Sequence, residues 1–183
     1  MTSTASKAAL AAVLLLSLTL SGCGYSLAGR GSFLPAYIKT IGMPVFVNLT
    51  PIPDVERKIT DKVRAELIGR GRYTIQPQTT GVDATLIGEI LAIGIAPAAF
   101  NQQQQATRYS LTIVAKIEFK DLKTGKVLWA NPSMAYTEQY DVTSQLGAAA
   151  TDAGAFLGQN ANALERLANE FARAVVSAML ESF

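Results

Sequence analysis

The sequence contains no histidine and only one cysteine among its 183 residues, and only 16% of its residues are charged. The lack of histidine removes the commonest general base and the commonest metal ligand. A single cysteine excludes an internal disulfide and any zinc site built from several cysteines. The formal net charge of +2 is too small for a dedicated nucleic-acid-binding protein, which normally carries a strongly basic face. We therefore expect no catalysis, no metal or other cofactor and no nucleic-acid partner.

The hydrophobic content of 49% is too high for a disordered chain, and the length fits one folded domain. Near the N-terminus, Lys7 precedes the apolar run Ala8–Leu20. A membrane-spanning helix needs about 20 such residues, so this shorter run is typical of the hydrophobic region of a signal peptide.

The only cysteine follows this run directly. The segment Leu20-Ser21-Gly22-Cys23 resembles the lipobox of bacterial lipoproteins. The resemblance implies transfer of diacylglycerol to the sulfur of Cys23, cleavage after Gly22 and acylation of the new N-terminus. Gly24 in place of aspartate implies export to the outer membrane. An ordinary secretory signal with a chance cysteine is the alternative.

These features predict three segments. Residues 1–22 form a lipoprotein signal peptide, and residues 23–34 form an acylated tether. Residues 35–183 form a single α/β sandwich domain. Three acyl chains exceed the two signals that stable membrane anchoring requires.

Apolar residues in the mature chain recur with two different periods. Between Val55 and Leu67 they return every four residues, which predicts an amphipathic helix with Asp54 as its N-cap and Gly69 near its end. A second apolar stripe predicts a helix over 161–183. Strands are predicted at 38–46, 73–76, 84–96, 109–120 and 127–140.

The strand at 109–120 alternates apolar and polar residues, which indicates a sheet with one wet face. Pro44 predicts an edge or a bulge in the first strand, and Gly88 and Gly94 suggest bends or bulges in the third. The fold class is therefore α+β: a two-layer sandwich whose mainly antiparallel sheet, of four or five strands, is covered by two helices.

The two long strands form a hairpin with an uncharged tip. The tip is a candidate partner-facing or ligand-facing surface. Its residues, with the nearest charged side chain, are Asn101, Gln102, Gln103, Gln104, Gln105 and Arg108.

Several short motifs across the chain resemble those of a known family. The mature N-terminus reads Cys23-Gly24-Tyr25, and Leu34-Pro35 precedes the first strand. Gly71-Arg72-Tyr73 follows the first helix, and Tyr109-Ser110-Leu111 opens the long strand. In order and spacing these motifs resemble the LptE family of lipopolysaccharide-assembly lipoproteins.

The resemblance implies a non-enzymatic outer-membrane lipoprotein that is lipid-anchored at the periplasmic face. Members of the family form a plug inside the LptD β-barrel, assist its assembly, and help deliver lipopolysaccharide to the outer leaflet. Their proposed lipopolysaccharide contacts are basic residues in the hairpin loop and before the last helix. Here the tip is uncharged, and residues 145–162 contain no lysine or arginine, so direct lipopolysaccharide binding stays open. A generic periplasmic adaptor lipoprotein of a secretion or cell-wall machine is the alternative.

Overall fold

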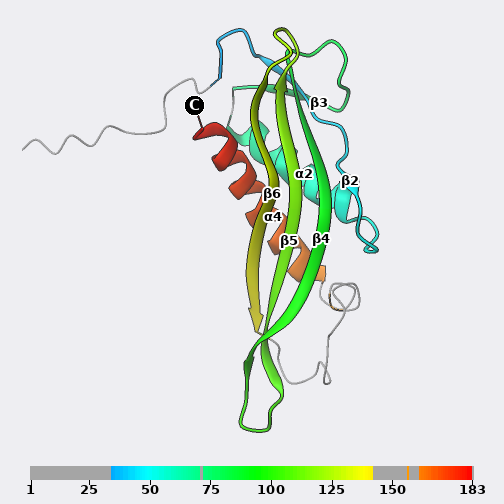
Figure 1. The fold of residues 1–183 in the computed structure, drawn as a ribbon, viewed down its shortest axis with the longest axis vertical. Helices are drawn as coiled ribbons and strands as arrows, with labels where there is room; N and C mark the ends of the chain where they lie inside the picture. Colours follow the sequence, from blue (N-terminus) through cyan, green and yellow to red (C-terminus); the bar gives the residue numbers. More distant parts are fainter. Residues whose placement is uncertain (1–33, 71, 142–155, 157–160, 183) are drawn as a thin grey trace, which may run out of the picture. The chain divides into compact units, whose positions relative to one another are not determined.

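The computed structural model describes residues 34–70, 72–141, 156 and 161–182, and Figure 1 traces them in colour. The predicted signal peptide, most of the tether and the lipidation site Cys23 lie outside the described residues. The predicted boundaries at 22 and 34 therefore stay predictions.

A mixed sheet of six strands is built around one long antiparallel meander. The meander consists of β4 (Ala84–Phe100), β5 (Ala106–Asp121) and β6 (Val127–Asp141). On the far side of β4, β1 (Thr40–Gly42) pairs in parallel with both β4 and β3 (Thr74–Gln76). The two-residue strand β2 (Val47–Asn48) also pairs with β4, further toward the hairpin tip.

Two helices, α2 (Val55–Gly69) and α4 (Ala161–Leu180), cover one face of the sheet and contact each other (Figure 1). The predicted apolar stripes face this interface. In α2, Val55, Ile59, Val63 and Leu67 are fully buried. In α4, the buried positions recur at helical spacing and include Leu167, Phe171, Val175 and Met179.

The alternation in β5 supplies the opposing side of the core. Leu111, Ile113, Ala115, Ile117 and Phe119 have no exposed surface. The intervening residues point to the other face of the sheet, which the helices do not cover. This arrangement confirms the predicted α+β sandwich with two helices on a largely antiparallel sheet.

The strand count exceeds the predicted four or five because residues 38–48 contribute two short strands rather than one. The chain leaves the sheet between β1 and β2, around Pro44. Of the two alternatives predicted for Pro44, an edge position is wrong for β1, which lies between β3 and β4, whereas the strand is interrupted near residue 44. Asp54 does occupy the N-cap position of α2, but its backbone is left-handed (φ 61°) and its side chain makes no capping hydrogen bond.

The irregularities in β4 lie at positions other than its glycines. The register shifts between Ile90 and Ala92 and again beyond Pro97, whereas Gly88 and Gly94 pair regularly with Ile117 and Thr112. Gly88 is needed for a different reason: a Cβ atom there would lie 2.6 Å from ring atoms of Phe46. The glycine therefore allows the chain between β1 and β2 to cross close to β4.

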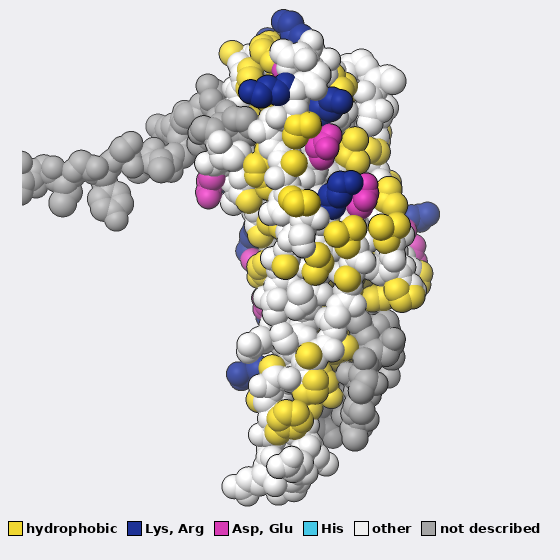
Figure 2. Space-filling view, in the orientation of Figure 1, with side chains coloured by type: hydrophobic (Ala, Val, Ile, Leu, Met, Phe, Trp, Pro, Cys, Tyr) yellow, Lys and Arg dark blue, Asp and Glu magenta, His cyan; other side chains and the backbone are white. Residues whose placement is uncertain are grey.

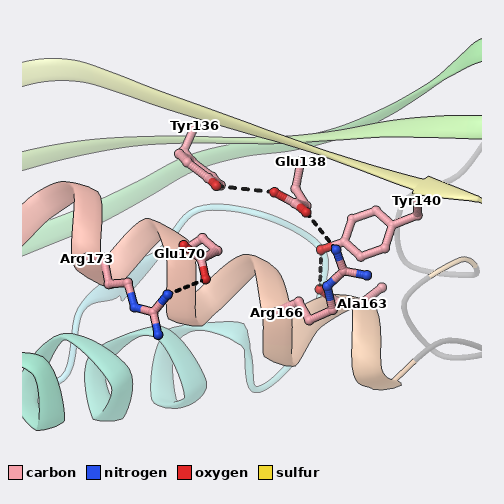
Figure 3. A network of polar contacts seen from close by, with 7 residues as sticks. All are labelled: Tyr136, Glu138, Tyr140, Ala163, Arg166, Glu170 and Arg173. Atoms are coloured by element: carbon pink, nitrogen blue, oxygen red, sulfur yellow. Dashed lines mark hydrogen bonds and ion pairs between the residues drawn. The ribbon is translucent and has the colours of Figure 1, made fainter.

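Polar contacts hold α4 against β6 (Figure 3). The Tyr140 hydroxyl donates to the carbonyl of Ala163 at 2.7 Å, and the guanidinium of Arg166 lies 5.0 Å from the centre of the Tyr140 ring. The same guanidinium donates to Glu138 at 2.8 Å. Burial raises the pKa of Tyr140 to about 12. The hydroxyl therefore stays protonated and able to donate over the whole physiological pH range.

Candidate functional site

A tight turn forms the tip of the β4–β5 hairpin, and Asn101 organises it. The side-chain oxygen of Asn101 accepts hydrogen bonds from the backbone N–H groups of Gln103 (3.0 Å) and Gln105 (2.9 Å). Its side-chain amide donates to Gln105 Oε1 at 3.1 Å. Gln104 adopts the left-handed conformation that closes the turn, with φ of 60°. The turn is thus fixed by its own hydrogen bonds.

The amide groups at the outermost positions of this tip face outward. The side chains of Gln102, Gln103 and Gln104 are exposed, and none of them hydrogen bonds to another described residue. A glutamine amide presents two donors and one acceptor with two lone pairs. The tip can therefore form hydrogen bonds to a polar surface without bringing a charge to it.

Phe100, which sequence reasoning missed, lies beside the tip. Its side chain is 61% exposed, the largest exposure of any big hydrophobic residue in the described part of the chain. The neighbouring residues Pro97 and Ala98 are also exposed. The third strand of the meander does not reach this far, because the last β5–β6 pair is Arg108 with Asp141. The sequence did contain a signal for an exposed Phe100: it is an aromatic residue at the end of a predicted strand, directly before a run of polar residues.

Arg108 marks the base of the tip, and it is already paired. Its Nε atom lies 2.7 Å from Oδ1 of Asp141 on β6. The pair is largely exposed, with 46% and 76% of the two side chains accessible. Arg108 therefore does not offer a free cation, although water competes strongly for such a pair.

The uncharged surface continues from the tip onto the sheet face that the helices leave open. In register, Gly94 lies opposite Thr112, and Thr112 lies opposite Thr137. The two threonine hydroxyls are 2.8 Å apart. Between the Arg108–Asp141 ion pair and the middle of the sheet, the residues of this face are small or uncharged: Ala92, Gly94, Ala96, Ser110, Thr112, Val114, Ala135, Thr137 and Gln139.

Charges gather on the other half of the same face. Lys116 and Glu89 form an ion pair across β4 and β5 at 3.2 Å. Figure 2 shows dark blue and magenta side chains mainly toward the β5–β6 turn, and yellow and white toward the tip. We call the tip residues 97–105 together with the uncharged half of the open sheet face the tip surface.

The second stretch that the family resemblance implicated, residues 145–162, lies mostly outside the described residues. Phe156 is described and is 2% exposed. Its ring contacts those of Tyr109 and Tyr140, with centroid distances of 5.7 and 6.2 Å. Phe156 therefore packs against side chains of both β5 and β6.

Among the described residues, no three side chains of the metal-ligating kinds group together. Within the same ranges, no helix is long and apolar enough to cross a membrane.

Comparison with known families identifies one match. A family model described as "LptE: Lipopolysaccharide-assembly" matches residues 38–179. This span runs from the segment before β1 almost to the end of α4. No curated protein sequence matches the chain significantly.

Several solved structures of bacterial proteins resemble the chain at low sequence identity. A protein from Xanthomonas campestris superposes with a TM-score of 0.50 at 11% identity, covering 79% of this chain and 84% of the other. Rare lipoprotein B from Shewanella oneidensis has a TM-score of 0.48 at 11% identity, with coverages of 79% and 96%. A minor lipoprotein from Acinetobacter baumannii has a TM-score of 0.47 at 9% identity, with coverages of 80% and 94%.

Proposed function

Since the chain belongs to the LptE family of lipopolysaccharide-assembly proteins, we propose that it is a non-enzymatic outer-membrane lipoprotein that plugs an LptD-type β-barrel. In this role it assists folding of the barrel and delivery of lipopolysaccharide to the outer leaflet. Acyl chains on Cys23 hold it at the periplasmic face. The observation that carries the proposal is the uncharged tip surface.

The chemistry of the tip surface suits the interior of a large barrel. Such interiors are polar, and side chains of the barrel wall offer hydrogen-bond donors and acceptors. An inserted plug loses contact with bulk water, so an unpaired charge on it would carry a large desolvation cost. The outward-facing amides of Gln102, Gln103 and Gln104 avoid this cost, and Phe100 supplies apolar contact area beside them.

The length of the hairpin is sufficient for insertion. Strand β4 has 17 residues, and at about 3.3 Å per residue it spans about 55 Å. The apolar band of an outer-membrane barrel is about 25 Å tall. One end of β4 can therefore remain at the periplasmic side while Phe100 and the tip reach far into the lumen.

The tip is not proposed as a lipopolysaccharide-phosphate site. Its outermost residues carry no charge, and Arg108 is occupied by Asp141. Phosphate recognition normally relies on free arginine or lysine side chains. We therefore propose that the protein assists lipopolysaccharide delivery indirectly, through its effect on the barrel. Direct binding of the lipid by the tip is not part of the proposal.

Anchoring and partnership are tested together by co-purification from detergent-solubilised outer membranes. The tagged wild-type protein should be labelled by palmitate and should retain a large barrel protein. Cys23→Ala should lose the label. Depletion of the lipoprotein should lower the amount of correctly folded barrel. Recovery of soluble periplasmic proteins alone, with barrel levels unchanged, would favour the adaptor alternative.

A further inference from the structure

The end of the domain opposite the tip carries an exposed mixture of lysines and large apolar side chains. In Figure 1, the β5–β6 turn and the segment before β1 lie together at this end. We call six of its exposed residues, the lysines and large apolar residues, the anchor-end surface. They are Tyr37, Lys39, Leu122, Lys123, Lys126 and Val127.

The apolar members of this surface are exposed to solvent. Tyr37 is 36% exposed, Leu122 is 41% exposed and Val127 is 42% exposed. Isolated exposed apolar residues need no explanation, but these three share one end with three lysines. Lys123 lies against Tyr37, with its ammonium nitrogen 4.7 Å from the ring centre. The surface therefore combines apolar area with positive charge.

The three lysines outnumber the carboxylates at this end, Asp83 and Asp121, and form no ion pairs with them. None of Lys39, Lys123 and Lys126 forms an ion pair with another residue in the part of the chain that the structure describes. Both carboxylates keep their negative charge and accept hydrogen bonds from the backbone and hydroxyl groups of this end. Asp83 accepts from the backbone of Lys39 and Thr40 at 2.9 and 2.8 Å.

Asp121, the second carboxylate, is 1% exposed, and its side chain accepts hydrogen bonds from residues of the β5–β6 turn. It accepts from the Thr124 hydroxyl at 2.6 Å, from the backbone of Lys123 at 2.8 Å, and from the Tyr37 hydroxyl. Its bonds hold the turn and the segment before β1 together. The lysine side chains are left pointing to solvent around a buried acid.

The chain that leads back to Cys23 joins the described part at this same end, through Leu34. Ten residues lie between Cys23 and Leu34, so an extended chain of eleven Cα–Cα steps spans at most about 40 Å between them. Acyl chains on Cys23, which form part of the proposed function on which this inference rests, would keep the anchor-end surface near the bilayer.

We propose that the anchor-end surface binds the anionic phospholipid surface of the leaflet in which the acyl chains insert. The lysines contact headgroup phosphates, and Tyr37, Leu122 and Val127 contact the boundary between headgroups and acyl chains. Tyrosine and lysine side chains suit this boundary because each has an apolar body and a polar end. The contact holds this end of the domain at the headgroups, and the hairpin tip lies at the opposite end of the domain.

The expected strength follows from the lysine count. A lysine close to an anionic membrane shifts the equilibrium toward contact about fivefold, and the attraction weakens as salt rises. Removing two lysines should therefore lower membrane contact about 25-fold. The acyl anchor raises the effective concentration of the membrane, so even this modest attraction changes the orientation of the tethered domain.

The test uses the full-length lipidated protein in vesicles that contain no barrel. Acylation occupies Cys23, the only cysteine, so Ala36→Cys provides a unique labelling site beside Tyr37, and Gln103→Cys provides one at the tip. A fluorophore at either site reports contact with nitroxide-labelled headgroups by quenching. Vesicles consist of phosphatidylcholine alone, or of phosphatidylcholine and phosphatidylglycerol in a ratio of about three to one, which supplies the anionic surface.

The proposal predicts strong quenching of the label at 36 in anionic vesicles, weaker quenching in neutral vesicles or high salt, and little quenching at 103. Lys123→Gln with Lys126→Gln should abolish most of the signal at 36. Arg57→Gln with Lys58→Gln removes the same charge from exposed positions of α2 and should leave the signal unchanged. Circular dichroism checks that both double variants are folded.

Two kinds of failure can be told apart. Protein that does not float with neutral vesicles lacks the acyl anchor, which contradicts the proposed anchoring. Protein that floats but shows equal quenching at 36 in both lipid mixtures overturns the inference about the anchor-end surface. So does an equal loss of quenching in the α2 double variant.

Discussion

The hydroxyl of Tyr37 donates a hydrogen bond to the buried carboxylate of Asp121, 84 positions later in the chain. This contact ties the segment before β1 to the turn between β5 and β6. Asp83 reinforces the same junction, since its side chain holds the backbone of Thr40 and its carbonyl accepts from the N–H of Leu122 at 2.9 Å. Asp83 and Asp121 thus connect the segment before β1, at the start of the domain, to the central meander.

Acid should weaken this junction. Hydrogen bonds from Thr124 and then Tyr37 lower the pKa of Asp121 to about 2, from an ordinary value of 3.8. Because the folded pKa lies below the unfolded one, the stabilisation is complete above about pH 4 and is lost as the pH falls toward about 2. Thermal melts between these limits should show a falling melting temperature.

Asp121→Asn should lower the melting temperature at neutral pH and flatten its acid dependence. Some dependence should remain, since hydrogen bonds from Lys39 and Thr40 also lower the pKa of Asp83. Asp61→Asn, at a carboxylate that is 70% exposed, should keep the wild-type profile. An Asp121→Asn profile parallel to that of the wild type would contradict this account of the junction.

Gly88→Ala should destabilise the fold, because its Cβ would lie 2.6 Å from the Phe46 ring. Overpacking of this kind costs about 1–3 kcal/mol. Gly94→Ala is the matched control on the same strand, where a Cβ would meet nothing within 4 Å. Urea unfolding should separate the two variants clearly. Equal free energies of unfolding would show that Phe46 can move aside.

Tyr140→Phe should weaken the docking of α4 on β6, because the carbonyl of Ala163 loses its 2.7 Å hydrogen bond. The expected cost is about 1 kcal/mol. Tyr136→Phe removes a hydroxyl that donates to Glu138 at 3.2 Å on the same strand and serves as the control. Hydrogen exchange of the α4 amides should increase in the first variant only. A larger increase in the second would assign the docking to Glu138 instead.

Two Phe→Ala changes should separate stability from partner binding. Phe171 is fully buried, so truncation should lower the free energy of unfolding by about 3–5 kcal/mol. Phe100 is 61% exposed, so truncation should leave stability nearly unchanged but should reduce co-purification of the barrel. Unaltered recovery of the barrel with Phe100→Ala would remove this residue from the proposed interface.

The sequence predicted the parts of the fold that arise from local periodicity. Period-two alternation placed Leu111 through Phe119 in the core, and the spacing of four placed the buried stripe of α2. These signals work because each element buries one face against the same core. The parallel pairing of β1 with β3 and β4 carries no such signal, since strands of three residues are too short to show a period.

Contacts between side chains far apart in the sequence could also not be predicted from local residue patterns. Lys62 of α2 forms an ion pair with Glu165 of α4, 103 positions away, and the residue pattern of α2 alone could not indicate this contact. Gly88 was expected to mark a bend, and only the position of Phe46 explains it. For the tip, the sequence indicated an uncharged hairpin end. The sequence did not indicate that β6 would end at Asp141, short of the position of Phe100.

The central claim is that the hairpin tip enters a barrel, and site-specific photo-crosslinking tests it most directly. A photoreactive residue in place of Gln103 in the lipidated protein should capture a large outer-membrane β-barrel protein in cells. The same residue in place of Lys58, on the exposed face of α2, is the comparison position and should capture the barrel less efficiently. Crosslinks from position 103 that contain only soluble periplasmic proteins would contradict the claim.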